Sequence, residues 1–359
     1  MIRCRLKISA QKESVEVSFN GLGRRHSKTT DTTREKTRTL ASLYYGKTYT
    51  DEALLLAEEI EKKFYTKNEM KYITTNARYA QFLKSMGNYI FQEVLPKEIA
   101  DEIRSLPPSS MIQLDVDENL SHLPWELMHT GHNFLCLEYI LGRTFNTIKD
   151  TPEPTKGPIP MLLVANPTGD LYGSQNEANY ILSQFRGSNL RISRYGPEIK
   201  KSDYLQLLRS GKFDIVHYTG HSQSSPTPGE CRHLFRDSDC YGHEIETLTI
   251  KKPPHLVFSN SCQSAEDSLE KDETGNTSLA GAYLKAGVGA CIGTIWQVSD
   301  VGASNFASDF YRYILFGATL GEALFNARRA SFKRWGYDVY IWASYIFFGD
   351  PDIRLIKKN

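Results

Sequence analysis

The sequence predicts an α/β fold in which a mostly parallel central sheet is covered by helices on both faces. From residue 159 onward, short apolar runs alternate with stretches of helical periodicity. The apolar runs, such as PMLLVAN (160–166) and FDIVHYTG (213–220), lack alternating polarity, which is typical of parallel strands buried on both faces. We therefore expect a main domain at 106–359, preceded by an N-terminal α+β extension at 1–105.

The sequence of the extension predicts a hairpin, a loop and helices. Residues 2–19 alternate apolar with charged side chains, as a half-buried hairpin does. The basic, Thr-rich segment 20–39 predicts a mobile loop, with a functional basic patch as the alternative. Helices are expected at 51–65 and at 76–95, where apolar side chains at helical spacing indicate core packing.

In the main domain, predicted strands and helices follow one another without an internal repeat. The strands are expected at 111–117, 160–166, 190–196, 213–220, 255–260 and 288–296, and the helices at 174–186, 201–211, 276–286, 300–315 and 319–333. In parallel sheets of this kind, binding sites form beyond the carboxyl ends of the strands.

Composition excludes several classes of protein. The 359 residues are 40% hydrophobic and 24% charged with a net charge of +1, so no nucleic-acid surface is indicated. The N-terminus lacks the apolar core of a secretory signal, and no run approaches the roughly 18 to 20 apolar residues of a membrane span. The six cysteines are scattered, which favours a reducing, cytoplasmic compartment.

A histidine and a cysteine follow two similar predicted strands. FDIVHYTGHS (213–222) ends in His221 and HLVFSNSCQS (255–264) in Cys262. If these strands are neighbours, the imidazole can lower the pKa of the thiol and make it a nucleophile. The amides of Ser222 and Cys262 could then form an oxyanion hole. The alternative is a structural cysteine and a hydrogen-bonded loop histidine.

Six segments of the sequence, two of which carry these residues, resemble the CHAT family of caspase-like cysteine peptidases, relatives of separase and metacaspases. They occur in the family's order and extend over about 110–355. They are LPWELM (123–128), LLVANPTGDLYGSQNEANYI (162–181), the two strand ends VHYTGHS and FSNSCQSA, GACIGTIWQVSD (289–300) and WASYIFFGDP (342–351).

The resemblance implies a caspase–hemoglobinase-like three-layer sandwich, with His221 as general base and Cys262 as nucleophile. This chemistry requires no metal or organic cofactor. The chain departs from its relatives at two positions. Ser222 stands where they often have glycine, and Asn260 stands where metacaspases carry the aspartate of a basic-specific pocket. The neutral Asn260 argues against a strict preference for a basic substrate residue.

Two further acids are candidates for substrate binding together with Asn260. Glu177 falls where relatives carry another pocket acid, and it would alternatively favour its helix N-terminus. Asp300 either lines the cleft or is the N-cap of the following helix.

Other features have structural explanations. The segment CRHLFRDSDCYGH (231–243) predicts a hairpin turning near 237–239, and its spacing matches no common zinc pattern. His217 is expected to be buried and hydrogen-bonded, and Trp125, Trp296 and Trp342 are expected in the core or scaffold. The acidic segment 264–278 is either a plain surface loop or a site of gating or self-cleavage.

We therefore expect a cysteine endopeptidase that cleaves a specific protein partner. By resemblance, the context is prokaryotic defence or regulated cell death, with a gasdermin-like pore former or another effector encoded nearby as substrate. Without sensor repeats, a separate activator protein or relief of an internal block is expected. The alternatives are a catalytically silent scaffold that binds a partner, and a ligase using the same dyad.

Overall fold

The structure is a computed structural model of the chain. It describes residues 2–10, 14–21, 24–30, 75–117, 120, 123–144, 153–225, 227, 229–261, 278–295, 298–336 and 341–357. The expected helix at 51–65 lies outside the described residues, as do Cys262 and Trp296.

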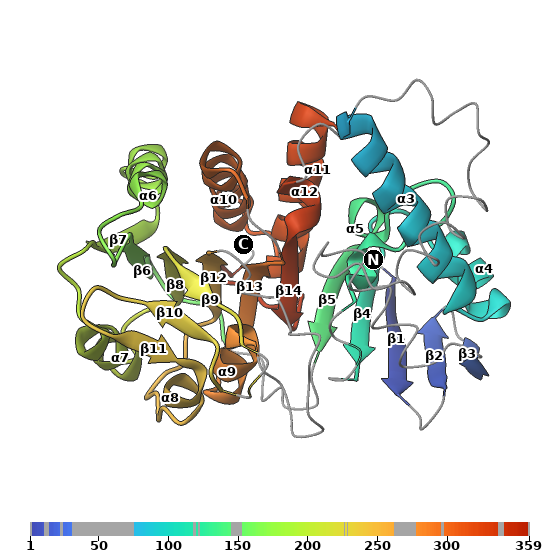
Figure 1. Cartoon of the computed structure of the whole chain (residues 1–359), viewed down its shortest axis with the longest axis horizontal. Coiled ribbons are helices and arrows are strands. Elements are labelled where there is room, and N and C mark those ends of the chain that lie inside the picture. The colour runs from blue at the N-terminus through green and yellow to red at the C-terminus, as the bar shows by residue number, and fades with distance from the viewer. Residues whose placement is uncertain are drawn as a thin grey trace.

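Eleven strands of the described chain form one sheet (Figure 1). They are β1 (Arg3–Ala10), β2 (Val15–Gly21), β3 (Arg24–Thr30), β4 (Met111–Val116), β5 (Ile140–Thr144), β6 (Ile159–Ala165), β7 (Leu190–Tyr195), β8 (Ile215–Thr219), β12 (Leu256–Asn260), β13 (Ala290–Thr294) and β14 (Tyr345–Gly349). Their order across the sheet is β3-β2-β1-β4-β5-β14-β13-β12-β8-β6-β7. The pairs β1–β2, β2–β3 and β13–β14 are antiparallel and the other neighbours are parallel, which confirms the predicted fold class.

Helices cover both faces of this sheet. The longer ones are α3 (Thr75–Glu93), α4 (Lys97–Ser105), α6 (Tyr172–Gln184), α7 (Lys201–Arg209), α9 (Leu279–Lys285), α10 (Asp300–Leu315) and α11 (Leu320–Trp335). Short elements are the 3-10 helix η3 (Trp125–Leu127), α5 (Leu135–Glu138), α8 (Gly242–Glu246) and α12 (Ile341–Ser344). In Figure 1, α6, α10 and α11 lie above the sheet, and α7, α8 and α9 lie below it.

Successive side chains of the central strands point to opposite faces, as the pleat requires. On β8, Ile215 packs in a cluster with residues of α6, α10 and α11. The next residue, Val216, packs with residues of α7, α8 and α9. All five positions of β8 are buried, as are all five of β12, which explains why their sequences lack an alternation of apolar and charged residues.

The N-terminal extension joins the main sheet. β1 and β2 form the predicted hairpin, and β1 pairs in parallel with β4. The predicted helix at 76–95 is α3, which buries Leu83, Met86 and Ile90. The predicted domain boundary at residue 105 therefore falls between α4 and β4. The strands before it (β1, β2 and β3) and the strand after it (β4) belong to the same sheet.

One expectation for the extension is wrong: residues 24–30 of the predicted basic loop form the edge strand β3, paired with β2. Charged side chains suit an edge strand, because they discourage pairing with another molecule. They also bind α4, since Lys28 pairs with Glu98 and His26 with Glu102.

A buried ion pair connects η3 to β5. Arg143 is 1% exposed and Glu126 is 3% exposed. The Arg143 guanidinium donates from Nε and Nη2 to the two carboxylate oxygens of Glu126, at 2.7 and 2.6 Å, and from Nη2 to the Leu123 carbonyl at 2.7 Å. The LPWELM segment is therefore fixed to the sheet by a buried bidentate ion pair.

The first prediction concerns this ion pair. Glu126→Gln leaves the buried Arg143 without its counter-charge, so the free energy of unfolding in urea should fall by about 3–5 kcal/mol. The matched control is Asp101→Asn, which breaks the exposed pair between Asp101 and Arg104. The control should cost less than about 1 kcal/mol. Equal losses in the two variants would contradict this assignment.

Candidate active site

The strands that precede His221 and Cys262 are immediate neighbours. β8 and β12 run parallel, and their last residues, Thr219 and Asn260, are paired in register. Both strands therefore end at the same point of one sheet edge. His221 lies two residues beyond β8, and Ser261, the last described residue before Cys262, directly follows β12.

A direct hydrogen bond joins the two chain segments just beyond these strand ends. The Ser222 hydroxyl donates to the Ser261 hydroxyl at 2.7 Å. Ser222 is the residue after His221, and Ser261 is the residue before Cys262. The structure thus brings together the immediate neighbours of both residues of the predicted dyad.

A third loop contributes an acid that the sequence analysis did not identify. β6 lies on the other side of β8, and the loop that follows it carries Asp170. The Asp170 carboxylate lies 3.3 Å from His221 Nε2, and both side chains are partly exposed. Because a carboxylate only accepts hydrogen bonds, this contact assigns a proton to Nε2 and leaves Nδ1 as the basic nitrogen of a neutral ring.

The loop that carries Asp170 is itself held in place. Asn166 adopts the left-handed conformation (φ 55°), and its side-chain oxygen accepts hydrogen bonds from the amides of Gly169 and Leu171. The backbone N–H of Asn166 donates to the carbonyl of Thr219 on β8. A hydrogen bond from Thr168, and a smaller contribution from His221, lower the pKa of the Asp170 carboxyl.

A buried polar network supports the strand ends from the face covered by α6 and α10. Glu177 on α6 accepts from His217 Nε2 at 3.0 Å and from the Thr219 hydroxyl at 2.7 Å. His217 Nδ1 lies 2.7 Å from the Tyr311 hydroxyl, so the prediction of a buried, hydrogen-bonded His217 is confirmed. Burial raises the pKa of Tyr311 well above its usual value, which keeps this phenol neutral.

The same network contains Asn260. Its amide donates to Glu177, and its oxygen accepts from the Tyr345 hydroxyl at 2.7 Å. Glu177 is 3% exposed and Asn260 is 6% exposed, so neither is presented to solvent. A substrate side chain would have to replace hydrogen bonds that Glu177 already makes. The assignment of these residues to substrate binding stays a prediction.

Asp300 lies at the rim of the same edge. It is the exposed first residue of α10, and the N-cap is its neighbour Ser299, whose side chain accepts from the Gly302 amide. The Asp300 carboxylate occupies the space that a Cβ on Gly173 would need, at the start of α6. Its role in substrate binding also stays a prediction.

The Cys- and His-rich segment forms the predicted hairpin. β10 (Arg232–Leu234) pairs antiparallel with β11 (Asp239–Tyr241), and β10 also pairs with β9 (Ser222–Gln223). His233 and Cys240 face each other in register, and both are buried. Within the part of the chain that the structure describes, no three His, Cys, Asp or Glu side chains gather in a way that could hold a metal ion.

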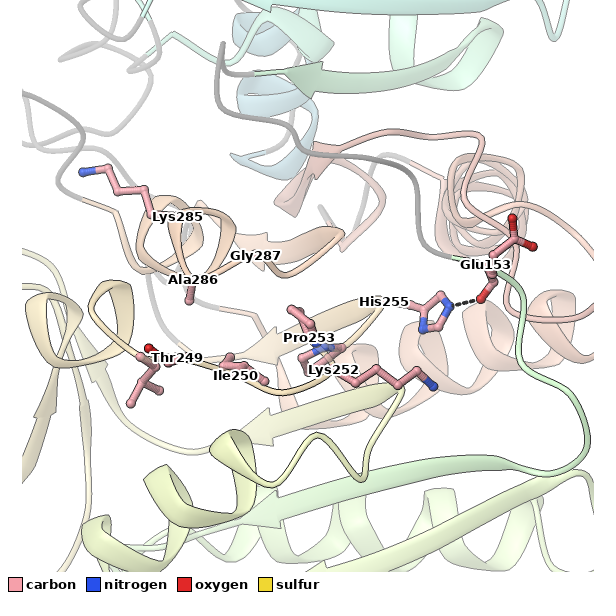
Figure 2. A pocket seen from close by; sticks show the side chains of 11 residues that line it. Glu153, Thr249, Ile250, Lys252, Pro253, His255, Lys285, Ala286 and Gly287 are labelled. Atoms are coloured by element: carbon pink, nitrogen blue, oxygen red, sulfur yellow. Dashed lines mark hydrogen bonds between the residues drawn. The ribbon is translucent and has the colours of Figure 1, made fainter.

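A cavity of about 540 Å³ lies at the opposite edge of the sheet (Figure 2). It is lined by residues that precede β12 and β13, among them Pro253, His255 and Gly287. These are the amino ends of the parallel strands whose carboxyl ends form the candidate active site. The cavity is therefore separate from that site.

Next to this cavity, the buried Asp214 interacts with three residues from two other segments of the chain. It accepts from Lys252 Nζ at 2.6 Å and from the Thr155 hydroxyl at 2.5 Å, and His255 Nδ1 lies 3.6 Å away. His255 also donates from Nε2 to the carbonyl of Glu153 at 2.7 Å (Figure 2). Burial disfavours the charged carboxylate, but interactions with His255, Lys252 and Thr155 outweigh it and hold the pKa of Asp214 well below its usual range.

The fold is the caspase–hemoglobinase-like α/β sandwich that the sequence predicts. The chain resembles Saccharomyces cerevisiae separase in its complex with securin, with a TM-score of 0.63 and 13% identity over 97% of this chain and 30% of the separase chain. A second structure of that complex gives a TM-score of 0.56 and 14% identity at the same coverage. The chain thus spans 30% of the separase chains that it matches.

The sequence identifies the family of the chain. The CHAT domain family matches residues 84–350, which is more than half of the chain, and the protein belongs to that family. No curated protein matches the sequence. Gingipain R, an Arg-specific cysteine proteinase, has a TM-score of 0.46 and 15% identity over 79% of this chain and 69% of its own. None of the described helices is both long enough and apolar enough to cross a membrane.

The second prediction concerns Asp214 and pH. Because its pKa is lowered by folding, the charged carboxylate stabilises the folded state above the unfolded pKa of about 3.9, and this stabilisation is lost as the pH falls. Asp214→Asn should lower the free energy of unfolding by about 1.5–3 kcal/mol at pH 7, with a difference that shrinks below about pH 4.

The control for this measurement is Glu153→Gln, which makes the same charge change at an exposed side chain of the same cavity. Urea unfolding of the three proteins between pH 3 and pH 7 provides the comparison. A constant difference between Asp214→Asn and the wild type over this range would contradict the assignment.

Proposed function

We propose that the protein is a cysteine endopeptidase in which Cys262 is the nucleophile and His221 the general base. The observation that carries the proposal is the pairing of β8 with β12, together with the Ser222–Ser261 hydrogen bond just beyond it. A thiol and an imidazole that leave neighbouring parallel strands at the same register emerge on one edge of the sheet, within reach of each other. Membership of the CHAT family supports the same chemistry.

The reaction follows from these roles. His221 removes the thiol proton of Cys262, and the thiolate attacks the carbonyl carbon of the scissile peptide bond. When the C–N bond breaks, the imidazolium donates that proton to the leaving amine, and a thioester remains on Cys262. His221 then takes a proton from water, whose oxygen attacks the thioester. The C–S bond breaks, the acid product leaves, and the thiolate recovers its proton from His221.

Two further groups assist in this proposal. The backbone amides of Ser222 and Cys262 form the oxyanion hole that stabilises the negative oxygen of the tetrahedral intermediates. Asp170 orients the imidazole: its contact with Nε2 turns Nδ1, the nitrogen that can accept a proton, toward the thiol.

We assign substrate recognition to Asn260, Glu177 and Asp300. The first two act through the buried network beneath the strand ends, and the exposed Asp300 acts at the rim. The aspartate of metacaspases is replaced by the neutral Asn260, and the Glu177 carboxylate is already hydrogen-bonded. We therefore propose a peptidase without a strict requirement for a basic residue before the cleaved bond.

The proposed substrate is a specific protein in a reducing cytoplasm. Separase was solved in a complex with the protein securin, and a protein partner is consistent with the present fold. By family resemblance, the substrate is an effector encoded nearby, such as a gasdermin-like pore former, and a separate activator protein switches the enzyme on.

The third prediction tests the thiol directly. Iodoacetamide alkylation, resolved by residue with mass spectrometry, should label Cys262 at pH 6, where a free thiol of pKa about 8.5 reacts slowly. His221→Ala should slow this labelling on the order of tenfold, because the thiolate loses its imidazolium partner. Alkylation of Cys262 that follows the pH profile of a free thiol in the activated protein would favour a silent scaffold.

The other cysteines provide controls within the same sample. Cys4, Cys136, Cys231, Cys240 and Cys291 are all buried. Burial raises the pKa of Cys136 and Cys291, and it raises that of Cys240 to about 12. These thiols should stay unlabelled in the folded protein, so any labelling of them reports unfolding.

The fourth prediction identifies the reaction. The protein is incubated with the products of adjacent genes, and the fragments are mapped by mass spectrometry. Cys262→Ala and His221→Ala should each reduce cleavage by at least about 10³-fold, because each removes a member of the dyad. Joined peptides in place of hydrolysed ones would indicate a ligase, and cleavage that persists in Cys262→Ala would contradict the proposal.

A further inference from the structure

A chain of side-chain hydrogen bonds links a buried histidine to both segments that carry the proposed dyad. His233 Nδ1 lies 2.7 Å from the Ser222 hydroxyl, which donates to the Ser261 hydroxyl at 2.7 Å. Ser261 in turn lies 2.7 Å from the hydroxyl of Ser259 on β12. This chain, His233–Ser222–Ser261–Ser259, lies on the face of the sheet covered by α7, α8 and α9, opposite the Glu177 network.

The surroundings of His233 fix its proton. The ring is fully buried. Its centroid lies 3.9 Å from the centroid of the Tyr218 ring and 5.9 Å from that of the Tyr283 ring. Burial lowers the pKa of His233 to about 3, so the ring is neutral and carries a single N–H. Nε2 has no hydrogen-bond partner, and a buried N–H left there would be costly. The proton therefore sits on Nδ1, which donates to Ser222.

The hydrogen bonds consequently run in one direction from His233 toward the segment before Cys262. His233 donates to Ser222, and Ser222 donates to Ser261. Hydrogen bonds also hold the backbone of the two segments that carry the dyad. The His221 carbonyl accepts from the Tyr218 hydroxyl at 2.7 Å, and the Ser261 carbonyl accepts from the Thr294 hydroxyl at 2.7 Å.

Beyond Thr219 and Asn260, the last paired residues of β8 and β12, backbone pairing between the strands no longer fixes the distance between the segments that carry His221 and Cys262. The Ser222–Ser261 bond is a direct side-chain connection between them past that point, and its donor is held by His233. We propose that His233 is a positioning residue, which sets the separation between the His221 imidazole and the Cys262 thiol through Ser222 and Ser261. This inference rests on the proposed function and adds a residue that acts on the dyad through Ser222 and Ser261.

The test compares variants that differ in whether a donor faces Ser222. His233→Phe fills the space without a donor, and His233→Asn keeps an N–H near the position of Nδ1. Ser222→Ala and Ser261→Ala remove the bridge itself and serve if His233→Phe does not fold. Ser259→Ala is the matched control, because it leaves both the His233–Ser222 and the Ser222–Ser261 bonds in place.

The readout is the pH profile of Cys262 alkylation, together with kcat and KM for cleavage of the activated protein's substrate. His233→Phe, Ser222→Ala and Ser261→Ala should each slow alkylation at pH 6 and lower kcat on the order of tenfold, with KM unchanged. His233→Asn should recover most of the alkylation rate and most of kcat. Ser259→Ala should change neither the alkylation rate nor kcat by more than about twofold. Thermal melts and the absence of alkylation at the buried cysteines establish that each variant is folded.

The outcomes separate this inference from the function beneath it. A folded His233→Phe or Ser222→Ala with a wild-type alkylation profile and kcat would overturn the positioning role, while loss of cleavage in Cys262→Ala would leave the peptidase assignment intact. An ordinary thiol profile in the activated wild-type protein would overturn the proposed function, and the positioning role with it.

Discussion

The parallel pairing of β8 with β12 is the constraint on which the rest of the candidate site depends. It aligns Thr219 with Asn260, so that both strands end at one point of the sheet edge. The two strands are about forty residues apart in sequence, so only tertiary structure can bring their ends together. Every functional role discussed above requires this register, because a shift along the strands would separate the two chain segments that follow them.

Polar networks on both faces then hold these strand ends. On one face, Glu177 binds His217, Thr219 and Asn260, and on the other, Ser222 binds Ser261. Burying a polar group is costly unless it is hydrogen-bonded, and a network whose groups are satisfied favours a single geometry. A pair of reactive side chains needs such support, since catalysis by a thiol and an imidazole is sensitive to displacements on the order of 1 Å.

Much of the fold could be predicted from the sequence, because short apolar runs such as 159–165 and 256–258 directly reflect strands buried on both faces. The strand β3 could not, because RRHSKTT has no apolar residue and is held by β2 and by contacts with Glu98 and Glu102 on α4, distant in sequence. Asp170 was missed for a similar reason: its contact with His221 depends on β6 lying beside β8, whereas β7 follows β6 along the chain.

The central claim is that the thiol and the imidazole meet at this sheet edge. A crystal structure of the activated protein with a peptidyl inhibitor bonded to Cys262 measures this directly. The account predicts roughly 3–4 Å between the Cys262 sulfur and Nδ1 of His221, with Asp170 still on Nε2. A sulfur directed away from the imidazole, with another group beside it in the position of a base, would contradict the account.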